Sequence, residues 1–331
     1  MFLKIRKRIS WFIINFRYAF RINKPRLTLR LIKNYLSIIF FRKKLLRYVD
    51  FAIGYKCNLN CQHCFATSLV EDGRHVITPI EYSYVVKEAM KLGAVNFSFQ
   101  GGEPLLCHEL GKYIKSADPK TNLISITTNG TLLSDEMLKK INKWGVDILT
   151  VSLDSGIPEE HDEFRGKKGC FFEVYNGIKR ALSYGINVTI GTVVTSQNLR
   201  SEGVKQLVDI SSELKVILML ILGIPIGRWK ERDDILLKEN DLAYLENLVS
   251  RHPYVRTDFN ANYYKRGCGA VKEIIYLNPY GDVFACPFIH CKLGNALSES
   301  LVGIREKALQ DDLFKSYHNI CIATLIEIYN G

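Results

Sequence analysis

The stretch YKCNLNCQHCF, residues 55–65, decides how this chain of 331 residues is interpreted. Its cysteines Cys57, Cys61 and Cys64 have the spacing C-x3-C-x2-C and follow a short apolar run that predicts a β-strand. Three thiolates can hold three irons of a four-iron cluster and leave the fourth iron open to a small molecule. A structural zinc site would need a fourth ligand, and His63, between two cysteines, has poor geometry for it. The stretch therefore predicts an iron–sulfur cluster with one open iron.

Further motifs follow along the chain: QGGEP at 100–104, TTNG at 127–130, VSLD at 151–154, and His161-Asp162 with Arg165-Gly166. Together with the cysteine triplet, and in this order, they resemble the radical S-adenosylmethionine (radical SAM) superfamily. The motif His161-Asp162 with Arg165-Gly166 resembles a signature of the peptide-modifying branch of that superfamily. The resemblance covers roughly residues 49–330.

Short apolar runs alternate with helical patterns from Tyr48 onward, which predicts an α/β fold with a parallel sheet and right-handed crossovers. We expect strands at 48–53, 95–99, 123–127, 147–153, 187–194 and 216–222, and helices near 79–92, 108–116, 134–144, 172–184 and 198–213. Six such units resemble the partial (β/α)6 TIM-like barrel of this superfamily. A helix at 237–252 and a hairpin around the turn 278–281 are expected to follow.

The motifs all fall where a predicted strand ends, which is where parallel barrels place their active sites. The resemblance implies that Gly101, Gly102 and Glu103 hold the methionine ammonium of S-adenosylmethionine (SAM), and that Ser152 and Arg165 hold its carboxylate. It also implies that His63 lies near the adenine. Asn129 could reach the ribose, or its side chain could simply cap the Asn-Gly turn.

The resemblance implies the reaction as well. An electron from a flavodoxin- or ferredoxin-type donor would enter the [4Fe-4S] cluster and pass to SAM, and cleavage would give methionine and a 5′-deoxyadenosyl radical. That radical would abstract hydrogen from a C–H bond of the substrate. The protein's own task is to orient the cofactor and exclude water.

A second group of cysteines lies in the last third of the chain. Cys268, Gly281 and Cys286 match the opening C-x(9–15)-G-x4-C of the SPASM and twitch extensions, which bind auxiliary clusters. The later cysteine run of a full SPASM domain is absent from the sequence, and Cys291 and Cys321 remain. The resemblance therefore implies a shortened, twitch-like domain with one auxiliary [4Fe-4S] cluster on four cysteines. The alternative is that Cys291 or Cys321 is a plain buried thiol.

Two cysteines, Cys107 and Cys170, stand outside both groups. We interpret them first as packing residues. As an alternative, either could donate hydrogen to a substrate radical, as a cysteine does in related peptide epimerases.

Charge is distributed unevenly. Residues 1–49 contain fourteen Lys and Arg and no Asp or Glu, which leaves 31 basic and 34 acidic residues in the rest. Apolar residues within 1–48 recur at helical spacing, in a first set at Ile5, Ile9, Phe12, Phe16 and Phe20 and a second at Leu27, Leu31, Tyr35, Ile38 and Ile39. The charge-free runs are too short to span a bilayer. Basic amphipathic helices of this kind favour peripheral contact with an anionic membrane, and packing against the barrel or a dimer partner is an equal alternative.

The predicted organisation is a basic helical segment at 1–48, a barrel at 49–226, a helical linker at 227–260 and the twitch-like domain at 261–331. The metal-type cysteine spacing favours a reducing, cytoplasmic location, with peripheral contact at the inner membrane surface left open. The positive charge belongs to the appended segment, so specific nucleic-acid binding is not expected.

Three functions remain open at this point. The first is a radical SAM enzyme that cross-links, epimerises or oxidises a ribosomal peptide or protein side chain. The second keeps the enzyme but acts on a membrane lipid or small metabolite. The third is a non-catalytic iron–sulfur or zinc-binding module, which leaves the Gly101-Gly102-Glu103 motif beside an open triplet unexplained.

Overall fold

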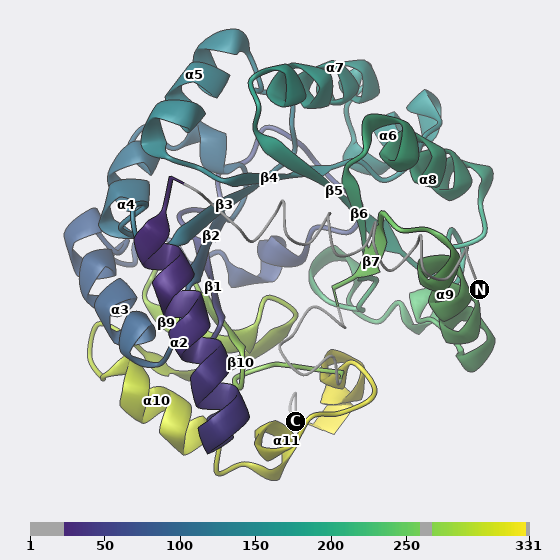
Figure 1. The fold of residues 1–331 in the computed structure, drawn as a ribbon. Helices are drawn as coiled ribbons and strands as arrows, with labels where there is room; N and C mark the ends of the chain where they lie inside the picture. Colours follow the sequence, from purple (N-terminus) through teal and green to yellow (C-terminus); the bar gives the residue numbers. More distant parts are fainter. Residues whose placement is uncertain (1–22, 259–266, 329–331) are drawn as a thin grey trace.

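A computed structural model of the chain describes residues 23–258 and 267–328. Parallel strands and helices alternate around a curled sheet (Figure 1). The parallel strands are β1 (Tyr48–Ala52), β2 (Asn96–Gln100), β3 (Leu123–Thr128), β4 (Ile148–Ser152), β5 (Asn187–Val194), β6 (Ile217–Leu222) and β7 (Val255–Thr257). The helices outside them are α3 (Pro79–Lys91), α4 (Leu110–Ser116), α5 (Asp135–Trp144), α6 (Pro158–Arg165), α7 (Cys170–Ser183), α8 (Glu202–Leu214) and α9 (Glu239–Arg251).

The two faces of the sheet differ in chemistry because successive side chains of a strand alternate. On the outer face Phe51, Phe97 and Phe99 are buried, and the ring of Phe51 stacks on Tyr82 of α3 at 4.2 Å. On the inner face Asp50 pairs in register with Ser98. The apolar outer face anchors the helices, and the inner face carries polar groups.

The expected partial barrel is confirmed. The six predicted strands are present with ends displaced by one residue at most, and 187–194 is β5 as predicted. Short elements escaped prediction, among them α6 and β7. The Val255–Thr257 strand is only three residues long, and so short a run carries little periodicity.

The C-terminal hairpin joins the barrel sheet instead of forming a sheet of its own. Its strands are β8 (Ile274–Leu277), β9 (Asp282–Cys286) and β10 (Ile289–Asn295). Strand β8 pairs in parallel with β1, so one sheet runs in the order β10-β9-β8-β1-β2-β3-β4-β5-β6-β7. Helices α10 (Leu301–Ala308) and α11 (Asp312–Lys315) follow. The domain boundaries remain predictions, but the hairpin and β1 share main-chain hydrogen bonds.

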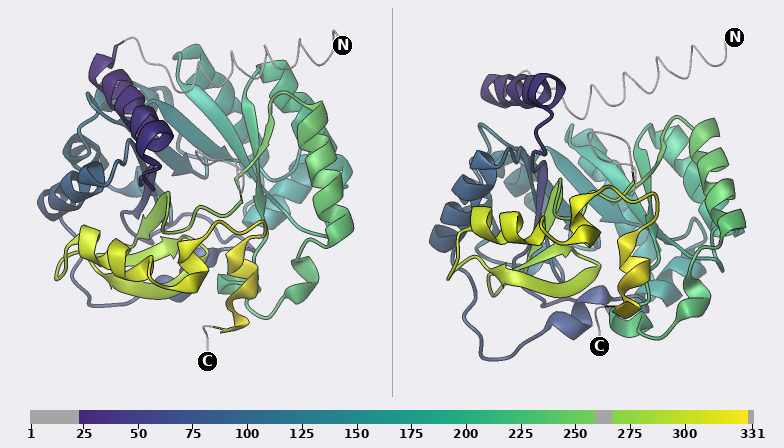
Figure 2. Two further views of the ribbon diagram at one scale, coloured as in Figure 1. Left: turned by 60° about the horizontal axis from the view of Figure 1, so that its bottom comes forward. Right: turned by 90° about the horizontal axis from the view of Figure 1, so that it is seen from below.

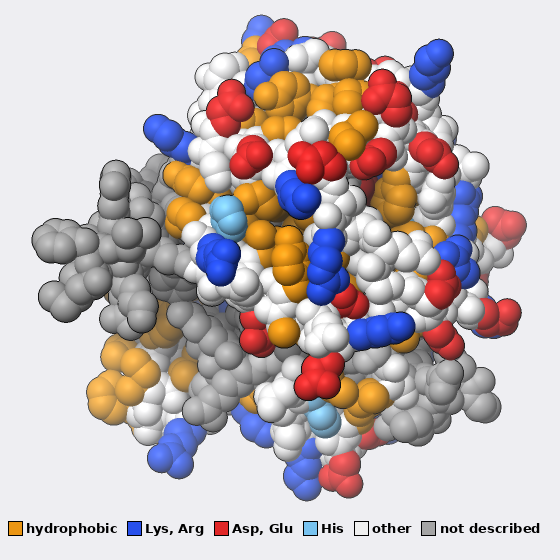
Figure 3. All heavy atoms as spheres, turned by 90° about the vertical axis from the view of Figure 1, so that its right-hand side faces the viewer, with side chains coloured by type: hydrophobic (Ala, Val, Ile, Leu, Met, Phe, Trp, Pro, Cys, Tyr) orange, Lys and Arg blue, Asp and Glu red, His pale blue; other side chains and the backbone are white. Residues whose placement is uncertain are grey.

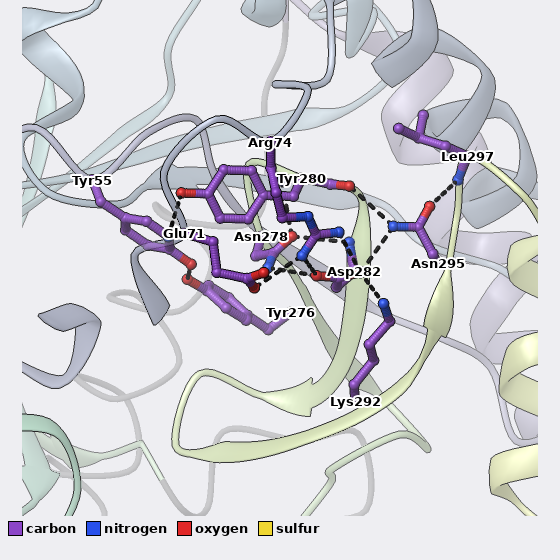
Figure 4. A network of polar contacts seen from close by, with 10 residues as sticks. All are labelled: Tyr55, Glu71, Arg74, Tyr276, Asn278, Tyr280, Asp282, Lys292, Asn295 and Leu297. Carbon is purple, nitrogen blue, oxygen red and sulfur yellow. Dashed lines mark hydrogen bonds and ion pairs between the residues drawn. The ribbon is translucent and has the colours of Figure 1, made fainter. Parts of the chain in front are cut away.

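A buried carboxylate fixes this hairpin to the barrel (Figure 4). Asp282 is 2% exposed and accepts hydrogen bonds from Arg74 at 2.6 Å and from Asn295 at 2.8 Å, with Lys292 at 2.6 Å as a second cation. Burial alone would raise the pKa of Asp282, but these partners hold it well below its usual value. Because Arg74 precedes α3, the network ties the loop that follows the cysteine triplet to β9.

Helix α2 (Pro25–Phe41) lies across the amino ends of the strands. It is the purple helix at the top of both views in Figure 2. Its contacts include the carbonyl groups of Gly93, Asn122 and Gly145, which come just before β2, β3 and β4. The first apolar set, Ile5 to Phe20, lies outside the described residues. Among those described, no helix is long and apolar enough to cross a bilayer.

Candidate active site at the carboxyl ends of the strands

The loop that carries the three cysteines, residues 54–64, leaves the carboxyl end of β1. It is held by the end of α6, by the segment after β6 and by the QGGEP motif. The main chain of Asn60 and Gln62 donates hydrogen bonds to Arg165 and Phe164 at the end of α6, at 3.3 and 2.9 Å. The Arg228 main chain donates to the Cys64 carbonyl at 3.1 Å. We call this segment the cysteine loop.

Glycines of the QGGEP motif fit against the cysteine loop itself. A Cβ at Gly102 would lie 2.3 Å from the carbonyl oxygen of Lys56, and one at Gly101 would lie 2.1 Å from that of Gly54. Gly101 also has φ = +141°, a conformation that side chains disfavour. The main chains are joined by hydrogen bonds from Gly102 to Gly54 and from Glu103 to Lys56. The two glycines thus serve close backbone contact with the loop that carries Cys57.

Glu103 is a buried carboxylate at the carboxyl end of β2. It is 3% exposed and accepts hydrogen bonds from the main chain of Asn129 at 2.7 Å and Leu105 at 3.0 Å, and from the Thr128 hydroxyl at 2.8 Å. Burial raises the pKa of Glu103 to about 7 in spite of these bonds. A bound cation would favour its ionised form.

Arg165 joins the cysteine loop to the end of β4. Its guanidinium donates to the Asp154 carboxylate at 2.6 Å, and Nη1 lies 3.6 Å from the Cys61 sulfur. Although burial acts to raise it, the pKa of Asp154 is lowered by Arg165. The same charge counteracts the rise in the Cys61 thiol pKa that burial causes. That Arg165 and Ser152 hold the methionine carboxylate of SAM stays a prediction; within the protein Arg165 pairs with Asp154, two residues after Ser152 at the end of β4.

His63 stacks in an apolar slot. Its ring lies 4.5 Å from Phe164 and 5.6 Å from Trp229, centre to centre. Its Nδ1 is buried without a hydrogen-bond partner, and burial lowers the pKa of His63 to about 3. The ring is therefore neutral, with one nitrogen available to a ligand. A cavity of about 210 Å³ is lined by Gln62, Phe164 and Trp229 among others.

Asn129 performs the local task that sequence analysis set beside ribose binding. Its Oδ1 accepts hydrogen bonds from the main chain and hydroxyl of Thr131, at 3.0 and 2.8 Å. Its Nδ2 donates to Asn58 at 2.8 Å. The side chain therefore caps the turn after β3 and braces the cysteine loop.

The motif His161-Asp162 with Arg165-Gly166 supports the cysteine loop. His161 is fully buried and accepts a hydrogen bond from the Asp154 main chain at 3.2 Å. Asp162 accepts from the Phe171 main chain at 2.8 Å and so caps α7. A Cβ at Gly166 would meet the Asn60 carbonyl oxygen at 2.8 Å. The motif therefore forms part of the surface on which the cysteine loop packs.

Arg228 is a residue of this site that sequence reasoning missed. It lies in η3 (Gly227–Trp229), after β6, and its guanidinium donates to the Cys61 carbonyl at 3.1 Å. A Cβ at Gly227 would lie 2.3 Å from the Cys64 carbonyl oxygen. Only the curvature of the sheet brings this segment to the cysteine loop, and no local pattern marks it.

The donors present fit an iron–sulfur cluster. Burial raises the pKa of Cys57 and Cys61, and nearby thiols, Cys64 for Cys57 and Cys57 for Cys61, raise each further. Such mutually repelling thiolates are stabilised by a cationic metal centre. In the described ranges, no three His, Cys, Asp or Glu side chains converge on a single metal-ion position. A cubane binds each thiolate to a different iron, so its ligands need not meet at one point.

The second group of cysteines comes together in a small core. Cys268 is buried, and Cys286, Cys291 and Cys321 pack against the same apolar cluster. Burial raises the pKa of Cys286, and both Cys268 and Cys321 raise it further. Cys268 also forms a β-bridge with His318, which brings in the segment before Cys321. Four thiols from three separate segments are thus part of one small apolar cluster or pack against it.

The remaining two cysteines, Cys107 and Cys170, follow β2 and β4 and pack with the main core. Cys170 is 0% exposed at the start of α7, with its sulfur 3.7 Å from His161 Nε2. Cys107 follows η2 (Pro104–Leu106) and packs at the edge of the main core. Both side chains pack as the first interpretation expects, and hydrogen donation by either cysteine stays a prediction.

Comparisons with known proteins agree with this geometry. Residues 51–208 match the family model of the radical SAM superfamily. The chain is 32% identical over 161 residues to the Fe-coproporphyrin III synthase of Methanosarcina barkeri, covering 49% of this chain and 40% of that protein. It is 29% identical over 190 residues to the AdoMet-dependent heme synthase of the same organism, covering 57% and 54%. The chain thus spans about half the length of these curated relatives.

A solved structure extends the likeness to the C-terminal region. Streptococcus suis SuiB bound to S-adenosylmethionine matches with a TM-score of 0.65 at 19% identity, over 89% of this chain and 77% of that chain. SuiB has also been solved with its precursor peptide SuiA, with the same TM-score. At this identity the likeness concerns the fold. The segment that matches the family model, residues 51–208, contains the cysteine loop, Glu103 and Arg165, and this part of the chain is a radical SAM domain.

Proposed function

We propose that this chain is a radical SAM enzyme that abstracts hydrogen from a C–H bond of a ribosomal peptide or protein side chain. The observation that carries the proposal is the arrangement at the carboxyl ends of the strands. There the loop with Cys57, Cys61 and Cys64 packs on the Gly101-Gly102 turn, next to a buried carboxylate and a buried guanidinium. When bound, the cluster and SAM would supply the electron transfer and the 5′-deoxyadenosyl radical.

The protein's side chains would divide the work of holding this cofactor. Glu103 would accept the methionine ammonium, and that interaction would favour loss of the proton that burial otherwise retains. Arg165 would favour the thiolate form of Cys61. The neutral His63 ring, stacked between aromatic side chains, would exclude water from this side of the cysteine loop.

The second cysteine group would hold one auxiliary four-iron cluster. Cys268, Cys286, Cys291 and Cys321 supply the four thiolates that such a cluster needs for full ligation. Their shared location in the small C-terminal core supports this proposal. A flavodoxin- or ferredoxin-type protein would deliver the electrons.

Two substrate classes have support. The motif His161-Asp162 with Arg165-Gly166, and a fold like that of the peptide-bound SuiB over 93% of this chain, favour a peptide. The names of the curated relatives, which are haem and coproporphyrin synthases, favour a small metabolite of tetrapyrrole type. We place the peptide first because the structural likeness includes the C-terminal region.

Cofactor chemistry is tested with the triple variant Cys57→Ala/Cys61→Ala/Cys64→Ala. After anoxic reconstitution with iron and sulfide, the wild-type protein should form 5′-deoxyadenosine from SAM under strong reductant, and the variant should form none. Its circular dichroism spectrum should match that of the wild type. Continued 5′-deoxyadenosine formation by the variant would refute the assignment.

Substrate class is tested by following hydrogen transfer. Deuterated candidate peptides encoded beside the gene, and separately Fe-coproporphyrin III, are incubated with reconstituted enzyme and SAM. The true substrate class should stimulate 5′-deoxyadenosine formation, and a deuterated peptide should pass label into it. Stimulation by the porphyrin alone would reverse the order of the two classes.

A further inference from the structure

Helix α2 has a row of apolar side chains on the side that faces away from the protein. Leu29, Ile32, Leu36, Ile39 and Phe40 are between 47% and 71% exposed. Their spacing of three and four residues places them along one side of the helix. We call these five side chains the α2 ridge. On the opposite side Leu27 is buried and Leu31 and Ile38 are half-buried, so α2 is apolar on both sides and buries only one of them.

The inward side of α2 is held by polar contacts. Lys24 forms a buried ion pair with Asp147 and donates to two main-chain carbonyl groups. Arg30 donates to the Ala94 and Thr121 carbonyl groups, and Asn34 donates to that of Gly93 at 2.7 Å. Only Leu27 adds a buried apolar side chain to the described helix. These fixed contacts leave the ridge facing outward.

Charge around the ridge is of one sign. Arg26 and Lys33 are exposed on α2, and Arg42, Lys43 and Lys44 follow its end, all exposed. Residues 1–49 contain no Asp or Glu. On the face formed by α6, α8 and α9, in contrast, acidic and basic side chains are interspersed (Figure 3). The combination of an apolar ridge with an unbroken set of cations is local to the α2 end.

We propose that the α2 ridge inserts into the surface of a membrane rich in anionic lipids. Apolar side chains flanked by cations are the pattern of interfacial helices, and each Lys or Arg near such a surface strengthens binding by about fivefold. A second copy of this chain would bring two cationic segments together, which charge repulsion opposes. The convex ridge also fits a bilayer, which needs no preformed groove.

This contact sets the orientation of the active site. The carbonyl groups that hold α2 precede β2, β3 and β4, whereas the cysteine loop and Glu103 follow β1 and β2. In a parallel sheet these are opposite ends of the strands. A membrane at α2 therefore leaves the active site facing the aqueous side. The substrate would arrive from water, which disfavours a lipid embedded in the same membrane.

The experiment uses the full chain and vesicles of phosphatidylcholine with or without phosphatidylglycerol. The wild-type protein should co-sediment with anionic vesicles at low salt, and binding should weaken with salt because exposed charges are screened. The variant Leu29→Gln/Leu36→Gln/Phe40→Gln should bind at least about tenfold more weakly. A matched control, Ile80→Gln/Tyr84→Gln/Phe172→Gln, removes equally exposed side chains elsewhere and should bind as the wild type does.

Orientation is tested with one added tryptophan at a time, in the variants Phe40→Trp and Ile80→Trp, each compared with the wild type and its three native tryptophans. Lipids brominated in their acyl chains should quench the added fluorescence at position 40 and leave that at position 80 unchanged. Failure of the wild type to bind anionic vesicles, or equal binding by the ridge variant, would overturn the proposal. So would a dimer in sedimentation equilibrium that the ridge variant dissociates while vesicle binding is absent.

Discussion

The substitution Gly102→Ala would test the contact on which the candidate site depends. The added methyl group would lie 2.3 Å from the Lys56 carbonyl oxygen and 2.5 Å from that of Tyr55. Carbon and oxygen do not approach within 3.0 Å, so the cysteine loop must move by at least about 0.7 Å. Both neighbours are backbone atoms and cannot rotate away. Overpacking of this kind costs about 1–3 kcal/mol.

The movement would also weaken two hydrogen bonds, from Gly102 to Gly54 at 2.9 Å and from Glu103 to Lys56 at 2.8 Å. Each contributes about 1 kcal/mol. We therefore expect Gly102→Ala to lower the free energy of unfolding by about 3 kcal/mol. Because the displaced segment carries Cys57, iron bound at the first site should fall as well.

Gly54→Ala is the matched control for this substitution. It adds the same methyl group in the same loop, but the new Cβ would have no atom within 4 Å. Denaturant unfolding under anoxic conditions gives the stability of each variant, and iron analysis with SAM-cleavage assays gives the loading of the first site. Equal stability and equal iron in the two variants would refute the argument that the glycine is required by loop contact.

Three further outcomes are expected. Reconstituted protein should carry about eight irons, as two cubanes, and the Cys57→Ala/Cys61→Ala/Cys64→Ala variant should retain about four. If that variant bound no iron, the assignment of an auxiliary cluster would be wrong. Asp282→Asn should lower the free energy of unfolding by about 2 kcal/mol near neutral pH. The pKa of Asp282 is lowered in the fold, so its contribution is present above its unfolded value and lost in acid; denaturation midpoints of variant and wild type should therefore converge at low pH. The pKa of Glu103 is raised from 4.5 to about 7, so its contribution in the cofactor-free protein is full below pH 4.5 and lost as pH rises through 7. Glu103→Gln should remove about 3 kcal/mol of the change in unfolding free energy between pH 4.5 and 7. An unchanged dependence of the unfolding free energy on pH in this variant would contradict the raised pKa.

Local sequence determined the elements of the barrel. The strand 187–194 is rich in β-branched residues and almost wholly buried, as expected of a parallel strand that is covered on both faces. The cysteine triplet and the QGGEP motif are contiguous, so their chemistry is legible without a structure. The turn residues 278–281 between two strand-like runs likewise predicted a hairpin, which is present as β8 and β9.

Residue roles within the site depended on tertiary contacts. Sequence alone could assign Asn129 to a ribose or to a turn, and the structure places its side chain on Thr131 and Asn58. Arg165 resembled a carboxylate ligand of SAM, and in the fold it contacts Asp154 and Cys61. The partners Asn58 and Cys61 lie 71 and 104 residues away in sequence, and no local pattern encodes those contacts.

The N-terminal region shows the same division between sequence and tertiary structure. Periodicity by itself indicated a second basic helical segment after Pro25, and this segment is present as α2. It could not determine which side faces the barrel. That was decided by carbonyl groups at the amino ends of β2, β3 and β4, which accept hydrogen bonds from Lys24, Arg30 and Asn34 and so leave the α2 ridge outward. Only the folded sheet brings those carbonyl groups together.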